Sequence, residues 1–311
     1  MSSIVFGPIL SRRFGKSLGI DLSPYKKICN YDCLYCELSP ARPTTEPQEV
    51  PEVEEIVAEV QKALHRYDDI DILTITANGE PTLYPKLAKL IKRLKEISGG
   101  RKILILSNGS TVPDRETREA LKMLDIVKLS LDCATPRCLR RIDRMHKSID
   151  PERIKEGMLK FAGEYEGSLI IEILVVAGIN DKESEMRALS DFLVKLAPER
   201  IDIGTIDRPP AYDVKAVDYG RLRELSMCFD PSLHIAITSR EGATDTKASS
   251  YTREEIISTL SRRPLTPHDV EILFDRESAK RLDSLVKEGK VTEVEKNGVI
   301  FFENCTKTLD K

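Results

Sequence analysis

Three cysteines lie within eight residues of the chain, and no fourth cysteine lies near them. The segment "CNYDCLYC" places them at Cys29, Cys33 and Cys36. Structural zinc sites are usually closed by four ligands, and iron–sulfur clusters are also usually held by four thiolates. Three thiolates on a four-iron cluster would leave one iron open, and an open metal position is typical of a catalytic site. A structural zinc ion and buried thiols are the alternatives for this trio.

Chemically unusual segments follow the other predicted strands, at the point where each strand ends. They are "NGEPTL" (78–83), "SNGS" (107–110), "SLDC" (130–133), "AGIND" (177–181) and "DRPPAY" (207–212). In parallel α/β folds the carboxyl ends of the strands share one edge, and active sites form there. We therefore expect these segments and the cysteines to build a single pocket.

Strand-like and helix-like patterns alternate along most of the chain. Strands are predicted at 17–23, 71–77, 102–107, 125–132, 168–176, 200–207 and 233–238. Amphipathic helices are predicted at 51–68, 84–97, 114–124, 151–165, 181–197 and 217–229. Nearly continuous apolar strands between such helices indicate a parallel sheet covered by helices. An open doubly wound sheet and a full or partial (β/α) barrel both satisfy this pattern.

The pattern changes after residue 240. The small, polar segment 241–250 resembles a linker, and it is followed by helical patterns at 252–260, 266–274 and 277–289. Two β-like runs joined by Asn297-Gly298 then predict a hairpin. Three helices and a hairpin are the layout of a winged helix. The expected division is a barrel domain over 1–240, a linker over 241–250 and a winged-helix-like domain over 251–311.

Composition excludes some classes of protein and leaves others open. The 311 residues carry a formal net charge of −3, which does not indicate a nucleic-acid binder but leaves room for a local basic patch. No apolar run is long enough to cross a membrane, and no secretory signal is visible. We therefore expect a cytoplasmic protein that has no membrane partner. In that compartment Cys133, Cys138, Cys228 and Cys305 are expected to be thiols, with a second cluster on Cys133 and Cys138 as the less favoured alternative.

The cysteine spacing followed by "NGEP" resembles the radical S-adenosylmethionine (SAM) superfamily over roughly residues 1–240. The resemblance implies a partial (β/α)6 TIM-like barrel and a [4Fe–4S] cluster on the three cysteines. It also implies that SAM binds the open iron through its amino and carboxylate groups. An electron from the reduced cluster, supplied by an external donor of the flavodoxin or ferredoxin type, would cleave SAM. The resulting 5′-deoxyadenosyl radical would abstract hydrogen from a substrate.

The same resemblance implies which residues contact SAM. Gly79, Glu80 and Pro81 would line its methionine amino group, and Tyr35 would lie near the adenine. Strand-end positions that match contacts to methionine, ribose or adenine are Ser107, Asn108, Ser130, Asp132, Ile179 and Asn180.

Within the superfamily, residues 6–36 resemble a branch grouped with the wyosine synthases, which modify transfer RNA (tRNA). The chain departs from those enzymes, because Glu37-Leu38 stands where they carry Trp-Arg and because Cys29 is its first cysteine. The segment "VVAGIND" also resembles glycyl-radical activating enzymes, which act on proteins and lack a winged-helix tail.

Basic residues near the pocket are candidates for substrate contact. Arg12 and Arg13, with nearby lysines, could meet a phosphate-bearing substrate, and Arg208 follows the sixth strand. Surface salt bridges are the alternative for these side chains. The open side of a partial barrel could admit a tRNA base, a protein or a small molecule. A different class of function is an iron–sulfur redox-sensing regulator with the winged helix as its output. In segment 277–288, however, the numbers of basic and acidic residues are equal, which does not favour binding to DNA phosphates.

Overall fold

The structure is a computed structural model that describes residues 4–11, 13–46, 49–237, 248, 250–262, 264–296 and 299–305. Its centre is one eight-stranded sheet whose strands follow the order of the chain. β1 and β2 are antiparallel, and every later neighbouring pair is parallel. The strands are β1 Val5–Ser11, β2 Gly15–Asp21, β3 Ile72–Thr76, β4 Lys102–Ser107, β5 Ile126–Ser130, β6 Ser168–Val175, β7 Arg200–Thr205 and β8 Ile235–Ile237. The sheet is open, because β1 and β8 form its two ends.

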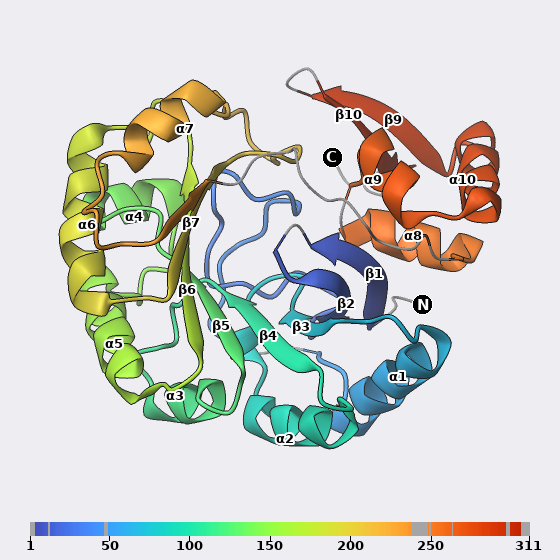
Figure 1. The fold of residues 1–311 in the computed structure, drawn as a ribbon, viewed down its shortest axis with the longest axis horizontal. Helices are drawn as coiled ribbons and strands as arrows, with labels where there is room; N and C mark the ends of the chain where they lie inside the picture. Colours follow the sequence, from blue (N-terminus) through green and yellow to red (C-terminus); the bar gives the residue numbers. More distant parts are fainter. Residues whose placement is uncertain are drawn as a thin grey trace.

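Seven helices connect these strands and lie on the outer side of the curved sheet (Figure 1). They are α1 Val53–Arg66, α2 Leu87–Ile97, α3 Arg115–Leu121, α4 Pro136–Asp143, α5 Pro151–Glu164, α6 Glu183–Leu196 and α7 Tyr219–Ser226. Apolar residues at helical spacing explain how they pack: in α1 the buried side chains are Val53, Ile56, Val57 and Val60, which share one face. The expected α/β class is confirmed, and the sheet is consistent with the expected partial barrel.

The sheet has a different core on each face. Alternate strand residues such as Leu73, Ile105 and Ile171 point outward and join the large core beneath the helices. The residues between them point inward. At one level the inner face is closed by a separate apolar group, which consists of Ile72, Leu104, Ile126 and Ile170, with Phe14 packed against it. We call this group the lumen plug.

The C-terminal part forms its own small core. It contains α8 Arg253–Arg262, α9 Pro267–Leu273, α10 Arg276–Lys287 and an antiparallel pair, β9 Val291–Lys296 and β10 Val299–Asn304. The part lies beside β1 (Figure 1), where the Tyr251 hydroxyl donates to the Pro8 carbonyl. It also contacts the end of α1, where Arg66 pairs with Glu255 at 2.6 Å. Its buried residues are Tyr251, Ile256, Leu260, Leu265, Leu273, Phe274, Leu282, Leu285 and Val291.

The predicted strands and helices correspond to observed elements, with small differences at their ends. β1 was missed because Gly7-Pro8 interrupts its pattern, and its pairing with β2 shifts register between Phe6 and Ile9. α4 was also missed, although Thr135 caps it and Pro136 begins it. The predicted turn Asn297-Gly298 and most of the predicted linker 241–250 lie outside the described residues.

One expectation about the cysteines was wrong. Cys133 and Cys138 form a disulfide instead of remaining thiols. Cys133 follows β5 directly and Cys138 lies in the first turn of α4, so the tight turn between them brings their Cα atoms to 5.7 Å, within the usual range for this bond. In the part of the chain that the structure describes, no helix combines the length and the apolar character that a membrane crossing requires.

Candidate active site

The three cysteines lie on the long loop between β2 and α1, at the carboxyl edge of the sheet. On one side, Ile28 N–H donates to the Asn78 carbonyl at 3.0 Å, and Glu80 N–H donates to the Ile28 carbonyl at 2.8 Å. On the other side, Leu34 N–H donates to the carbonyl of Ile142, in α4, at 2.8 Å. These backbone hydrogen bonds hold the loop between the end of β3 and the end of α4.

All three loop thiols are free and half-buried. The Cys33 thiol lies 3.3 Å from a carboxyl oxygen of Asp143, and Lys27 Nζ lies 3.7 Å from Cys36 Sγ. Burial raises the pKa of all three thiols, that of Cys29 to about 12. Protein groups alone thus disfavour three thiolates here, and bound iron would supply the positive charge that stabilises them.

The arrangement of these thiols fits a cluster better than a single ion. Within the described residues, one set of potential ligands brings three ligand atoms within 4.8 Å of one another: Cys133, Cys138 and Glu185, two of which are joined in the disulfide. The loop thiols form no such set, which argues against one zinc ion between them. A four-iron cluster binds its thiolates at separate iron corners. Three free thiols on one loop therefore suit such a cluster with one iron left open.

Side-chain amides connect the cysteine loop to the end of β4. Asn30 is buried, donates to the Ser110 hydroxyl at 2.7 Å and accepts from the Asn108 side chain at 2.9 Å. The Asn108 amide nitrogen also lies 3.9 Å from Cys29 Sγ. Asn108 was expected at the site, whereas Asn30 was missed. The only indication of Asn30 in the sequence was that it is a polar residue directly after Cys29.

Glu80 lies buried beneath this network, where its carboxylate joins two strand ends. One oxygen accepts from the Thr82 backbone at 3.0 Å, the Thr82 hydroxyl at 2.6 Å and the Ser107 hydroxyl at 2.7 Å. The other accepts from Asn108 N–H at 2.7 Å. Burial raises the pKa of Glu80, and these hydrogen bonds oppose that shift. Pro81 begins the short 3-10 helix that follows, Pro81–Leu83. The expected residues Gly79, Glu80, Pro81, Ser107 and Asn108 therefore lie close together.

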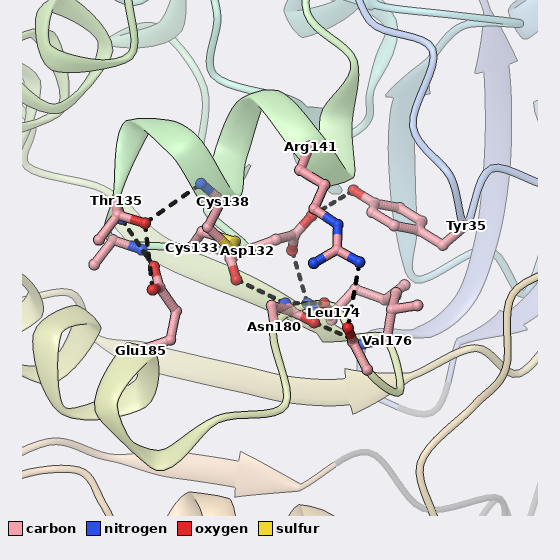
Figure 2. The surroundings of a disulfide bond; sticks show 12 residues. Tyr35, Asp132, Cys133, Thr135, Cys138, Arg141, Leu174, Val176, Asn180 and Glu185 are labelled. Atoms are coloured by element: carbon pink, nitrogen blue, oxygen red, sulfur yellow. Dashed lines mark hydrogen bonds between the residues drawn. A yellow bond between two sulfur atoms is a disulfide. The ribbon is translucent and has the colours of Figure 1, made fainter.

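Tyr35 and Asp132 meet across the site (Figure 2), where the Tyr35 hydroxyl donates to the carboxylate at 2.6 Å. The other Asp132 oxygen accepts from Leu174 N–H at 2.8 Å. Burial raises the pKa of Asp132 to about 7, and the neighbouring Asp143 is also shifted upward by burial and by Asp132. The structure thus directs Tyr35 toward a buried carboxyl pair, of which sequence reasoning had identified only Asp132.

Asn180 fixes the segment that carries Asp132 (Figure 2). Its amide nitrogen donates to the backbone carbonyls of Asp132 at 2.8 Å and Leu174 at 2.9 Å, and its oxygen accepts from Val176 N–H at 2.7 Å. Ile179 packs against the main core, and Ser130 is half-buried at the end of β5. The side chain of Asn180 is therefore occupied by the backbone of two strand ends.

The three candidate arginines have different surroundings. Arg208 pairs with Glu37 at 2.6 Å, which joins the β7 loop to the residue after the last cysteine. Burial favours the neutral form of Arg208, but the charges of Glu37 and Asp207 and the hydrogen bond to Glu37 together outweigh it and leave the pKa of the guanidinium raised. Arg13 pairs with the buried Asp202. Arg12 lies outside the described residues.

A cavity of about 1330 Å³ occupies the inner side of the sheet. Its walls come from seven successive strands, β1 to β7, with Ile9, Ser17, Thr74, Leu104, Lys128, Glu172 and Gly204 among the lining residues. Lys27 and Arg208 line it near the cysteine loop, and Ser261 of the C-terminal part contributes to it as well. The space is large enough for a small organic molecule beside the strand-end residues.

Comparisons with known proteins agree with this arrangement. The sequence profile of the radical SAM superfamily matches residues 24–189. A UPF0026 protein of Helicobacter pylori (strain J99) is 42% identical over 300 residues, which cover 96% of each chain. A UPF0026 protein of Methanocaldococcus jannaschii is 29% identical over 318 residues, covering 99% of this chain and 98% of that one.

The fold also resembles a solved structure. A radical SAM methyltransferase from Sphaerobacter thermophilus aligns with a TM-score of 0.58 at 15% identity, over 72% of this chain and 67% of that one. At this identity the likeness concerns the fold alone, whereas the profile match spans more than half of the chain and includes all three loop cysteines. The chain belongs to the radical SAM superfamily, whose members are enzymes that use a [4Fe–4S] cluster and S-adenosylmethionine.

Proposed function

We propose that this protein reductively cleaves S-adenosylmethionine and abstracts a hydrogen atom from a substrate bound in the inner cavity. The observation that carries the proposal is the position of Cys29, Cys33 and Cys36, three free thiols on a loop at the carboxyl edge. These residues would hold the [4Fe–4S] cluster. When bound, the cluster supplies the electron that converts SAM to methionine and a 5′-deoxyadenosyl radical.

The protein groups around the loop would bind and orient SAM. Glu80 offers a buried carboxylate to the methionine amino group, which it would hold by a charge-assisted hydrogen bond. Tyr35 and Asp132 would lie near the adenine and ribose, with Asn180 acting through the backbone of Asp132. The other proposed SAM contacts are Gly79, Pro81, Ser107, Asn108, Ser130 and Ile179.

The superfamily requires an external reductant, and we propose a flavodoxin- or ferredoxin-type donor. The sequence resemblance to the wyosine-synthase branch keeps a tRNA base among the candidate substrates, beside a small molecule or a protein residue. Arg13 and Arg208 would contact the substrate, since both line the cavity. Arg12 is proposed for the same role on sequence grounds alone.

We further propose two domains, a barrel over 1–240 and a winged-helix-like domain over 251–311, joined by a linker over 241–250. The separate C-terminal core supports this division. On α10, Lys280 is paired with Glu277, and Arg253 of α8 is paired with Glu288. Because these cations are neutralised within the domain, they favour packing against protein over binding phosphate.

The decisive experiment is anaerobic reconstitution with iron and sulfide, followed by SAM and dithionite. We expect 5′-deoxyadenosine and methionine in equal amounts, with a rate that rises when the true substrate is added. A cluster that forms but never cleaves SAM, in a protein whose DNA affinity follows the redox state of the cluster, would instead support the redox-sensing regulator.

A further inference from the structure

Three charged residues lie in the interior of strands that are mostly apolar. They are Lys128 in β5, Glu172 in β6 and Asp202 in β7. Lys128 and Glu172 line the inner cavity, and Lys128 lies two residues beyond Ile126, a member of the lumen plug. Because side chains alternate along a strand, Lys128 is on the same face as the plug and one layer closer to the strand ends. The cavity therefore has a charged floor above an apolar base.

Cations outnumber carboxylates in this floor. Asp202 has no exposed surface and contacts three cations: Arg13, Lys128 at 3.3 Å and Arg200 at 2.8 Å. Glu172 provides the second carboxylate, paired with Lys128. Burial lowers the pKa of Arg13, and the charge of Asp202 opposes that shift. Among the described residues of this floor, three cations and two carboxylates leave an excess positive charge beside the cavity.

The two carboxylates differ in how easily a ligand could replace them. Asp202 is fully buried and is not among the residues that line the cavity, whereas the side chain of Glu172 is 42% exposed and lines the cavity together with Arg13 and Lys128. An anion that enters the cavity can therefore displace Glu172 from Lys128 while Asp202 stays in place. A buried ion network is generally no more stable than an apolar replacement, so the fold alone does not require these charges beside the lumen plug.

We propose that Lys128 and Arg13 form a subsite for an anionic group of the substrate, a carboxylate or a phosphate, and that Glu172 occupies this subsite when the substrate is absent. The inference rests on the proposed function only in identifying the ligand as the substrate. Ser130, at the end of β5, lies about 7 Å farther along the strand, at ~3.3 Å per residue. The anionic group would thus be held below the strand ends, and the rest of the molecule would extend toward the cysteine loop. This geometry favours a small organic anion over a tRNA base.

The test measures anion binding to the reconstituted protein without SAM or reductant, so that it is independent of SAM cleavage. Inorganic phosphate and malonate are added in separate series, with chloride holding the ionic strength constant. Apparent Kd values come from the rise in the midpoint of thermal unfolding. Stabilisation by phosphate only, by malonate only or by both identifies which anionic group the subsite accepts. Stabilisation by neither would overturn the proposal.

Two variants of the same ion pair should change the affinity in opposite directions. Lys128→Gln removes a charged donor and should weaken anion binding by about 10-fold or more. Glu172→Gln removes the competing carboxylate and should tighten binding several-fold. Lys86→Gln, which breaks an exposed pair with Glu52, is the matched control and should change nothing.

If these ion pairs served only to stabilise the fold, the result would differ: both substitutions would destabilise the protein, and neither would change anion affinity selectively. If Lys128→Gln does not fold, the increase in affinity expected for Glu172→Gln still decides the question. Unchanged or weaker binding in Glu172→Gln contradicts the proposal, whatever the protein does with SAM. If anion binding behaves as expected and SAM is never cleaved, the subsite stands and the proposed function fails.

Discussion

Gly79 and Ile28 are in backbone contact that leaves no room for a side chain on the glycine. A Cβ atom on Gly79 would lie 1.8 Å from the Ile28 carbonyl oxygen, and the φ angle of +144° is one that residues with side chains rarely adopt. The contact forms an isolated parallel bridge, and Ile28 directly precedes the first cysteine of the loop. The glycine of "NGEP" therefore sets the position of the cysteine loop, a role distinct from contact with SAM.

Gly79→Ala should displace the cysteine loop and lower the free energy of unfolding by at least ~2 kcal/mol, since backbone must move to relieve the clash. Iron bound per chain after reconstitution should fall as well, measured together with the unfolding midpoint. Gly163→Ala is the matched control: a Cβ there meets nothing within 4 Å, and alanine should stabilise α5 slightly. Full iron content in Gly79→Ala would refute the positioning role.

Sequence reasoning predicted the strand–helix order because each element has a strong local pattern. Examples are the apolar run of β4 and the amphipathic face of α2. β1 has no such pattern, since Gly7-Pro8 interrupts it and its pairing with β2 is non-local information. Asp143 and Asn30 were missed for a related reason. Each gains its importance from a partner distant in the chain, such as Cys33 for Asp143 and Ser110 for Asn30.

The sequence contains an indication of the charged floor of the cavity. Lys128, Glu172 and Asp202 each stand in an apolar strand, and a buried charge in such a position must find partners or a ligand. Their convergence depends on the register between neighbouring strands, which places Glu172 opposite Asp202. The register between neighbouring strands could not be predicted, because the strands are far apart in the sequence. The ion pairs were therefore visible only in the structure.

Cys36→Ala should abolish cluster binding and SAM cleavage while it leaves the fold intact. The thiol is half-buried at a loop position, so its removal creates little cavity volume. Iron and sulfide content, the visible absorption of the reconstituted protein and its far-ultraviolet circular dichroism test this expectation. The control is Cys228→Ala, a buried thiol in the main core, which should retain full iron content. Normal iron content in Cys36→Ala would count against the assigned ligand.

Glu80→Gln should retain the cluster and weaken SAM binding by about 10-fold or more, because it removes the negative charge proposed to face the methionine amino group. The same change weakens hydrogen bonds from Thr82, Ser107 and Asn108, so some loss of thermal stability is also expected. Equilibrium binding of SAM to the reconstituted, unreduced protein separates affinity from turnover. Glu52→Gln, which alters an exposed ion pair, should bind SAM normally. Unchanged SAM affinity in Glu80→Gln would remove this residue from the proposed site.

The pair formed by Glu37 and Arg208 should show energetic coupling. The two side chains are 23% and 30% exposed and join the cysteine loop to the loop after β7. In a double-mutant cycle with Glu37→Gln and Arg208→Gln, we expect a coupling energy of roughly 1–3 kcal/mol in the free energy of unfolding. Additive effects would mean that the pair contributes nothing to stability. Arg208 would then be available for substrate contact alone.

The disulfide between Cys133 and Cys138 predicts a definite alkylation pattern. Protein prepared anaerobically without thiol reductant, stripped of iron and denatured in guanidinium should alkylate at Cys29, Cys33, Cys36, Cys228 and Cys305 only. After reduction all seven cysteines should react, as peptide mass spectrometry can show. Because the bond closes a short loop, its loss should cost about 2 kcal/mol of stability. Alkylation of Cys133 and Cys138 before reduction would mean that they are thiols, as first expected from the sequence. Their proximity to Glu185 would then make a metal site the next arrangement to test.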